Sequence, residues 1–399
     1  MLIDIESVLG NGSYRIKDKE KARVFATVCH EGLTTRKRLV EILGIRPTTV
    51  SNSIQQLVED RLVLEQDLIN SGRQGRPEIS LGPNFDRICA IALVTVSQKI
   101  RGVLINLGQQ ILADESRELD REAGNRALTR VLEDLLQSLL DKKPPGSEVA
   151  GIGISLPGDV NGETERWLFN ARWKNIRNFS FRKIADNTGL PFRLIRMLDA
   201  ELGYQLLEHP EYGKGGTLLF HWGFGIGAAY ANQGTVNRST LGSFIEIGHI
   251  SLAGNMRKTC TCGEVGCVET EAALWSLIEE IRRIQPDAPE DETLFSGYLS
   301  TIPYDQVSAI LERAKTTIVE SLNVLYRMFY PDRILIYGPF TDNPSIESEL
   351  KDQFRQRIPS FARNKVRLVI FHDRNAAGKI FGSTLELFRR SLQDYLVVH

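Results

Sequence analysis

The sequence predicts an α/β protein in which a small N-terminal helical domain precedes two lobes. Three observations support this prediction. The 399 residues are too many for one compact core. The first part of the chain has the pattern of three short helices and two strands. Strands followed by helices then occur in two successive series, which is typical of two related α/β lobes.

The N-terminal part has the pattern of a winged helix-turn-helix. The segment ARVFATVCHEG has apolar residues at helical spacing and ends at Gly32. TTRKRLVEILGI predicts a second helix that is capped by Thr34 or Thr35 and ends at Gly44. RPTTVSNSIQQLVEDRLV predicts a third helix with Pro47 near its first turn. The strand-like segments LVLEQDL and EISLG, separated by INSGRQGRP, complete the wing.

The pattern changes after Pro83. ICAIALVTV, KIRGVLIN and QQILADESREL predict three strands of a meander, followed by a helix over 123–141 and the strand VAGIGISLPG. The second series begins near Thr217 with GTLLFHWGFGIGAAYANQG. Helices over 270–284 and 304–330 and the strand RILIYG follow it.

These patterns divide the chain into four expected units. Residues 1–82 form the DNA-binding winged helix with its wing and linker. Residues 83–200 form the first lobe, and residues 201–375 form the second lobe with the cysteine-rich loop. We expect residues 376–399 to form a C-terminal helix that packs back on the first lobe.

The composition is typical of a cytoplasmic protein. Apolar residues make up 42% of the chain and charged residues 25%, which is ordinary for a globular protein. No apolar run reaches the roughly 18 residues of a membrane helix, and the N-terminus has no signal-peptide core. We therefore expect no membrane partner. The net charge of −1 argues against coating of a polyanion, although one small domain can still bind DNA.

Three of the five cysteines lie close together in CTCGEVGC, from Cys260 to Cys267. Their spacing supplies three thiolates on one tight loop, and Gly263 and Gly266 allow the backbone to curl. Tetrahedral zinc takes four ligands, and His249 lies 11 residues upstream of the first cysteine. The alternative is a set of three reduced thiols without a metal. The pattern favours a structural zinc ion.

The string GSFIEIGHISLAGN, followed by CTCGEVGCVET, resembles the signature of the ROK family of bacterial sugar kinases and sugar-responsive repressors. GIGISLPGDV, NARW and MLDAELG resemble further segments of that family, and the N-terminal part resembles its repressor branch. The resemblance covers roughly residues 15–385. It implies an actin/hexokinase-like (ribonuclease H-like) fold for the two lobes. The zinc ligands that it implies are His249, Cys260, Cys262 and Cys267.

Kinases of the family hold ATP with three glycine-rich loops, and the equivalent loops differ here. The first should read D-x-G-G-T, but residues 94–98 read VTVSQ. The second should read G-T-G-x-G, but residues 223–227 read GFGIG. The third should read I-G-G-G, but residues 336–339 read IYGP. Because phosphoryl transfer depends on positioning and charge stabilisation, we expect no kinase activity and no catalytic residues.

The resemblance also implies a sugar pocket between the lobes. Carboxylates accept hydrogen bonds from adjacent hydroxyls, and a zinc-bound histidine has a fixed orientation. Leu198 and Ile245 replace the Asn and Gly of the family, so a vestigial pocket and a ligand other than an unmodified hexose are alternatives. The polar residues expected in the pocket are Asn170, Asp199, Glu246, His249 and Glu269.

The helix Pro47–Leu57 is the predicted recognition helix, with Val50, Ile54 and Leu57 on its core face. The wing segment SGRQGRP carries two arginines, which can enter a narrow minor groove. Such helices also mediate protein contacts, and a solvated linker is the alternative for the wing. The residues expected to contact DNA are Arg46, Thr48, Thr49, Ser51, Asn52, Gln55, Arg73 and Arg76.

Residues 36–76 contain seven basic and five acidic side chains, a weak positive excess of 7 − 5 = +2. Two copies of the domain would double this modest attraction for DNA. We therefore expect a homodimer, or a homotetramer, on a two-fold-related double-stranded operator. The sequence predicts a sugar-responsive transcriptional regulator, in the first instance a repressor, with a sugar or sugar derivative in the cleft. The alternatives are a ROK sugar kinase with an appended DNA-binding domain and a constitutive DNA-binding protein with a vestigial sugar pocket.

Overall fold

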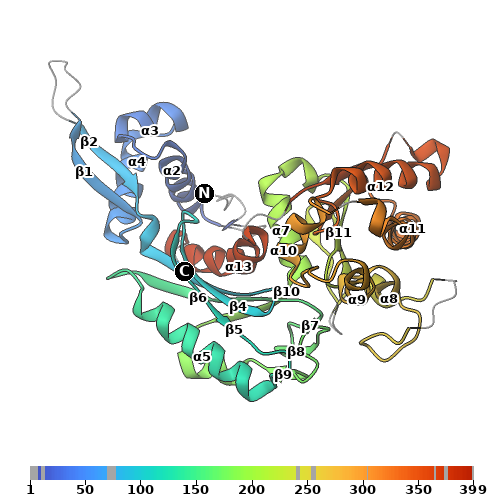
Figure 1. Ribbon diagram of the computed structural model, residues 1–399. Helices are drawn as coiled ribbons and strands as arrows, with labels where there is room; N and C mark the ends of the chain where they lie inside the picture. The colour runs from blue at the N-terminus through green and yellow to red at the C-terminus, as the bar shows by residue number, and fades with distance from the viewer. Residues whose placement is uncertain are drawn as a thin grey trace.

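The computed structural model consists of an N-terminal domain that projects from a body of two lobes (Figure 1). No helix among the described residues is both long and apolar enough to cross a lipid bilayer. The residues that the structure describes are 8–9, 14–69, 78–239, 243–252, 258–302, 304–363, 365–372 and 376–397.

The N-terminal domain is a winged helix-turn-helix, as predicted. The Thr35 hydroxyl caps α3 by accepting a hydrogen bond from the main-chain N–H of Arg38 at 3.3 Å. Gly44 ends α3 in the left-handed conformation, with φ of 64°. Main-chain hydrogen bonds between Thr34 and Leu81 tie the wing to the turn before α3. The elements are α2 (Ile16–Glu31), α3 (Arg36–Leu43), α4 (Pro47–Glu59) and the antiparallel strands β1 (Val63–Ile69) and β2 (Glu78–Pro83).

The third helix of this domain, α4, buries one face and exposes the other. Val50, Ile54 and Leu57 are fully buried in the cluster that contains Phe25 and Leu39. This burial confirms the predicted core face of α4. Packing of this apolar stripe fixes the helix, so the opposite face is free to contact a partner.

The first lobe is built on a five-stranded mixed sheet with the order β10-β6-β3-β4-β5. One face is covered by α5 (Asn125–Asp141), and the other carries α13 (Ala377–Leu396). The strands are β3 (Ile88–Val96), β4 (Lys99–Asn106), β5 (Ile111–Glu118), β6 (Glu148–Leu156) and β10 (Phe192–Arg196). A small sheet of β7 (Asp159–Asn161), β8 (Arg166–Phe169) and β9 (Phe179–Ser180) and the helix α6 (Arg182–Thr188) complete the lobe.

The second lobe repeats the strand connectivity of the first. Its sheet has the order β13-β12-β11-β14-β15. The first two pairings in this order are antiparallel and the last two are parallel, as in the first lobe when its sheet is followed from β5 to β10. Helix α7 (Met197–Glu208) packs on one face. The strands are β11 (Gly216–Trp222), β12 (Ile226–Asn232), β13 (Thr235–Val236), β14 (Arg333–Tyr337) and β15 (Arg367–Ile370). The other face carries α8 (Val268–Ala272), α9 (Leu274–Ile284), α10 (Glu292–Leu299), α11 (Tyr304–Phe329) and α12 (Pro344–Arg357).

The predicted single helix over 270–284 is wrong, because the structure has two helices that break at Ala273. Ala273 is extended, with φ of −76° and ψ of 145°. The main-chain N–H of Leu274 donates to the Gly223 carbonyl at 2.9 Å, and the Trp222 indole donates to the Ala272 carbonyl at 2.8 Å. These tertiary hydrogen bonds capture backbone groups that a continuous helix would use itself.

Helix α13 connects the N-terminal domain to the body of the molecule. Its first residues border the space between the lobes, its middle crosses α7, and its last turns contact α2. Lys21 of α2 donates to the Tyr395 carbonyl at 2.7 Å, and the Arg87 guanidinium donates to the Tyr395 hydroxyl at 2.6 Å. Leu392 and Leu396 share one apolar cluster with residues of α2 and α4. These contacts would transmit a displacement of α13 to the N-terminal domain.

The crossing of α13 and α7 depends on Gly382. A Cβ atom at this position would overlap the Ala200 carbonyl of α7. Gly382→Ala is expected to lower the melting temperature by roughly 3–8 °C, because overpacking outweighs the usual gain of alanine in a helix. The matched control is Gly203→Ala in α7, where a Cβ meets nothing within 4 Å and alanine should stabilise. Thermal denaturation followed by circular dichroism measures both; stabilisation by Gly382→Ala would show that the helices are not tightly packed.

Candidate functional site

A cavity of about 670 Å³ lies between the two lobes. The first lobe contributes the β3–β4 turn and the segment after β8, and the second contributes the β11–β12 turn, η3 (Ile247–His249) and α10. Of the five predicted sugar contacts, four line this cavity. They are Asn170, Glu246, His249 and Glu269.

Glu269 is a fixed acceptor at the back of the cavity. Only 4% of the residue is exposed, and its carboxylate accepts hydrogen bonds from the Ile226 N–H at 2.8 Å and from the Trp275 indole at 2.9 Å. Burial raises the pKa of Glu269, and these donors and His249 oppose that rise. Glu246 reaches the same space from the start of η3, with Oε2 3.9 Å from Nε2 of His249.

Asn170 lines the cavity, but its side chain is used mainly to shape the loop that follows it. Its Oδ1 accepts a hydrogen bond from the Trp173 N–H at 2.6 Å, and its amide nitrogen donates to the Trp173 carbonyl at 3.4 Å. With 1% of the residue exposed, Asn170 holds the NARW segment in place. This segment presents Arg172 to the cavity.

Asp199 does not line the inter-lobe cavity, which corrects the prediction. Helix α7 begins at Met197, so its first turn directs Met197 and Leu198 towards the cavity and rotates Asp199 away from it. Asp199 instead borders a second cavity of about 840 Å³ beside β10 and α13. Burial raises its pKa, while Arg196 and Arg238 lower it. One carboxylate oxygen has no hydrogen-bond partner within the described part of the chain.

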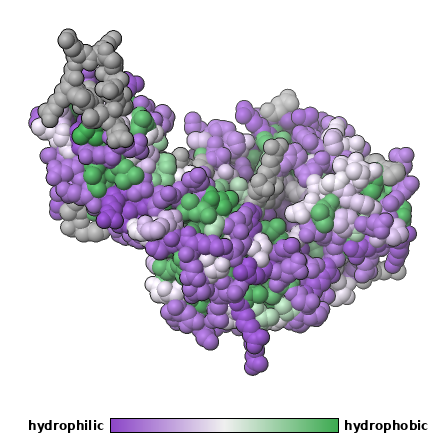
Figure 2. Space-filling view, turned by 60° about the vertical axis from the view of Figure 1, so that its left-hand side comes forward, coloured by the Kyte–Doolittle hydropathy of each residue, from purple (hydrophilic) through white to green (hydrophobic). Residues whose placement is uncertain are grey.

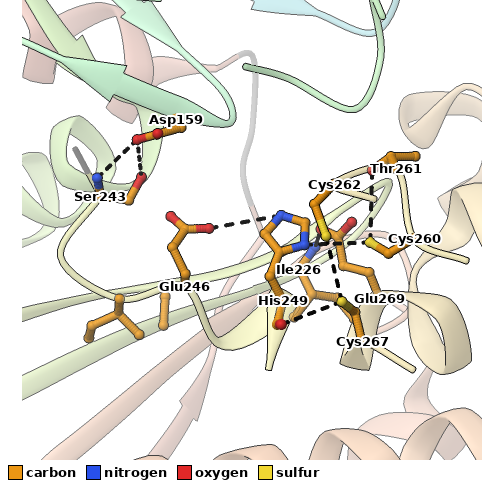
Figure 3. A network of polar contacts seen from close by, with 12 residues as sticks. Asp159, Ile226, Ser243, Glu246, His249, Cys260, Thr261, Cys262, Cys267 and Glu269 are labelled. Atoms are coloured by element: carbon orange, nitrogen blue, oxygen red, sulfur yellow. Dashed lines mark hydrogen bonds and ion pairs between the residues drawn. The ribbon is translucent and has the colours of Figure 1, made fainter. Parts of the chain in front are cut away.

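His249 and the three clustered cysteines converge at one end of the cavity (Figure 3). The Nδ1 atom of His249 lies 3.5 Å from the Cys260 sulfur, and the sulfurs of Cys262 and Cys267 are 3.7 Å apart. All four ligand atoms lie within 4.8 Å of one another. Gly263 and Gly266 have φ of 102° and 79°, which explains the two glycines of the loop.

These distances fit a tetrahedral metal ion. Sulfur ligands at about 2.3 Å from zinc lie about 3.8 Å from one another in a tetrahedron, close to the separations observed. The ring of His249 faces two ways: Nδ1 points to the cysteines and Nε2 points to Glu246 (Figure 3). The cluster can therefore bind a metal, and a bound ion would fix the imidazole that borders the cavity.

The three turns expected to correspond to phosphate-binding loops all border the cavity or lie next to it. Ser97, in the β3–β4 turn, has φ of 53° and donates its hydroxyl to Asp291 at 2.6 Å. Phe224 fills the β11–β12 turn, and its ring is covered by the Arg172 guanidinium at 4.0 Å. Gly338 has φ of 136° and packs on the Trp222 carbonyl, where a Cβ would not fit.

A charged group in the cavity was not predicted from the sequence. Arg172, His221 and Glu292 all line it, with Glu292 3.5 Å from Arg172 and 3.7 Å from His221. The only signals in the sequence were the arginine in NARW and the acidic run EDE before α10. Neither signal is specific, because acidic runs are usually solvated surface.

The predicted DNA-contacting side chains of α4 lie on its outer face. Thr48, Ser51, Asn52 and Gln55 are exposed, as is Arg46 immediately before the helix. Gln55 donates to Glu59 at 3.0 Å, and Thr49 is half-buried. The N-terminal domain projects from the lobes (Figures 1 and 2), and the exposure of these side chains shows that the described part of the chain leaves this face open. Arg73 and Arg76 lie outside the described residues.

Curated relatives and solved structures cover most of the chain. The xylose repressor of Caldicellulosiruptor bescii is 26% identical over 75% of this chain and 74% of its own length. The DNA-binding transcriptional repressor Mlc of Escherichia coli is 21% identical over 88% of each chain.

The fold comparison extends to both regulators and kinases. A ROK family transcriptional regulator homologous to E. coli Mlc superposes with a TM-score of 0.68 at 22% identity, covering 96% of this chain and 98% of that one. A ROK hexokinase from Thermus thermophilus superposes with a TM-score of 0.57 at 20% identity, covering 77% and 99%. The model of the ROK family matches residues 92–385. The chain belongs to the ROK family.

Proposed function

We propose that the protein is a transcriptional repressor that binds operator DNA through α4 and its wing and responds to a sugar. The observation that carries this proposal is the winged helix-turn-helix with an exposed polar helix face, joined to a ROK domain. The printed names of the relatives, xylose repressor and Mlc repressor, support the same function. A regulator of this kind acts in the cytoplasm, on the chromosome.

The inter-lobe cavity is the proposed sugar site. Its volume suits a small ligand, and Glu246 and Glu269 supply carboxylates that accept hydrogen bonds from hydroxyls. Leu198 and Ile245 add an apolar wall, so the ligand is a sugar or a sugar derivative with a less polar face. We propose that the site binds without catalysing phosphoryl transfer, since Ser97, Phe224 and Pro339 stand in the three turns.

We further propose that the His249 and cysteine cluster holds a structural zinc ion. The set of three thiolates and one imidazole suits zinc, and it provides no open coordination position. The ion would connect η3, which carries His249 and directly follows Glu246, to α8, which carries Glu269. It would thereby fix three of the four cavity residues predicted from the sequence.

The proposed response passes through the lobes to α13. A ligand that draws the lobes together acts on the residues of both that line the cavity, including Ala376 and Lys379 at the start of α13. The far end of α13 contacts α2 through Lys21. In a homodimer or homotetramer such a movement changes the spacing of two recognition helices, and operator half-sites lie a fixed distance apart.

Selection of bound fragments from sheared genomic DNA tests the DNA-binding function. We expect the purified protein to enrich a two-fold-related sequence and to bind it at least about 1,000-fold more tightly than a scrambled duplex at physiological salt. Equal affinity for both duplexes would contradict the proposed function.

Two assays distinguish the alternatives. Consumption of ATP in the presence of a sugar panel would indicate a kinase. Thermal shift against D-xylose, N-acetylglucosamine and D-glucose identifies a working pocket, because a ligand that binds only the folded state stabilises it. D-xylose follows the name of the xylose repressor. N-acetylglucosamine follows the name of a further relative, the N-acetylglucosamine repressor of Escherichia coli, which is 21% identical over 86% of this chain. D-glucose follows a solved ROK family glucokinase from Streptomyces griseus in complex with glucose.

A further inference from the structure

The carboxylate of Glu292 lies in a ring of donors within the inter-lobe cavity. It accepts a hydrogen bond from the main-chain N–H of Phe224. The Arg172 guanidinium lies 3.5 Å from one of its oxygens, and Nε2 of His221 lies 3.7 Å from the other. A main-chain N–H in a glycine-rich turn, a guanidinium and an imidazole are together a donor set suited to phosphate.

The surrounding structure makes room for this carboxylate. A Cβ at Gly223 would overlap both the Glu292 carboxylate and the His221 ring, so the glycine opens the space that Glu292 fills. The Arg172 side chain is 11% exposed and stacks on Phe224, which fixes its direction. The donors are thus held in position whether or not a ligand is bound.

Glu292 is charged in this position. Burial alone would raise its pKa, but His221, Arg172 and the Phe224 N–H outweigh that effect and bring the pKa below its usual range. The carboxylate is therefore ionised at neutral pH, and it neutralises the Arg172 guanidinium that faces it.

The two preceding residues hold Glu292 against the first lobe. Asp291 accepts a hydrogen bond from the Ser97 hydroxyl at 2.6 Å, and Glu290 forms an ion pair with Arg121. Both partners belong to the first lobe, whereas the acidic run belongs to the second. These cross-lobe contacts keep the carboxylate in the cavity rather than in solvent.

Other cations of the cavity wall are also engaged. Arg101 forms an ion pair with Asp114 at 2.6 Å, and Arg196 donates to the carbonyls of Ala228 and Ile245. Lys379 is attracted to Glu292 itself. A phosphorylated ligand would have to displace Glu292 and leave a carboxylate beside its own negative charge, which costs free energy in a partly buried site.

We propose that Glu292 permanently occupies the anion position of the inter-lobe cavity and restricts its ligand to uncharged, unphosphorylated sugars. This inference rests on the proposed function only in naming the ligand a sugar. The occupation of the anion position concerns the protein alone.

Inorganic phosphate is the probe that tests this proposal. Thermal shift is measured at constant ionic strength, with phosphate replacing chloride, for the wild type, Glu292→Ala and the control Glu279→Ala. Glu279→Ala removes an exposed acid of α9 in the same lobe and leaves the contacts of Glu290, Asp291 and Glu292 described above in place. We expect 20 mM phosphate to raise the melting temperature of Glu292→Ala by about 3 °C or more relative to the other two proteins.

A second variant keeps the proposal testable if Glu292→Ala does not fold. Glu292→Gln keeps an acceptor for the Phe224 N–H and removes the charge, and phosphorus NMR titration should detect phosphate binding to it that is at least about tenfold tighter than to the wild type. Phosphate binding by the wild type equal to that of the variants would overturn the proposal, as would two folded variants that both ignore phosphate. Neither result depends on operator DNA, so failure here is distinguishable from failure of the proposed repressor function.

Discussion

Replacement of Cys260 by serine is expected to abolish stoichiometric zinc binding and to destabilise the second lobe. The Cys260 sulfur lies 3.5 Å from Nδ1 of His249, and its loss leaves a site with three ligands. Changes outside the ligand set already weaken metal sites by about 10–100-fold, and loss of a ligand should cost more. Because metal binding is linked to folding, the melting temperature should fall by roughly 5–10 °C.

Metal analysis of the purified protein, combined with thermal denaturation, measures this effect. The control is Cys29→Ser, which makes the same chemical change at a half-buried cysteine in α2, far from the cluster. The wild type and this control should each retain one zinc ion per chain. Retention of a full equivalent by Cys260→Ser would exclude that cysteine as a ligand and with it the proposed link between η3 and α8.

Asn52→Ala is expected to weaken operator binding by about 1–3 kcal/mol without changing the affinity for random DNA. Asn52 is exposed on the outer face of α4, and a carboxamide suits bidentate recognition of adenine in the major groove. Arg46→Ala should behave differently. As a phosphate contact it should weaken binding to all sequences and reduce the salt dependence by about one unit of slope.

Fluorescence anisotropy with labelled operator and scrambled duplexes over a range of salt concentrations separates these two effects. Asn187→Ala is the matched control, because Asn187 is an exposed asparagine on α6 of the first lobe. Operator affinity of Asn52→Ala equal to that of this control would mean that α4 does not read bases.

The features that could be predicted from the sequence depend on local patterns. The caps of α3, the buried stripe of α4 and the cysteine loop are each specified by residues within about one or two helical turns of one another. The repetition of strands and helices was also visible, because each strand is a short apolar run. His249 could be predicted as the fourth ligand because it lies close to the loop in sequence.

The features that were missed depend on contacts between distant segments. Asp199 was misplaced because the rotation of the first turn of α7 is set by packing on β12, which no local pattern reports. Glu292 could not be predicted because its partner Phe224 lies 68 residues away, and Arg172 lies on the other lobe. The break at Ala273 has the same origin, since Trp222 and Gly223 supply the hydrogen bonds that interrupt the helix.

Reciprocal titration of sugar and operator tests whether occupancy of the inter-lobe cavity controls DNA binding. Operator affinity is measured with and without a saturating sugar identified by thermal shift, and sugar affinity is measured with and without operator. We predict that the sugar weakens operator binding by about 5–150-fold and that operator weakens sugar binding by the same factor. Operator affinity that stays unchanged when the cavity is saturated would show that the cavity does not control DNA binding.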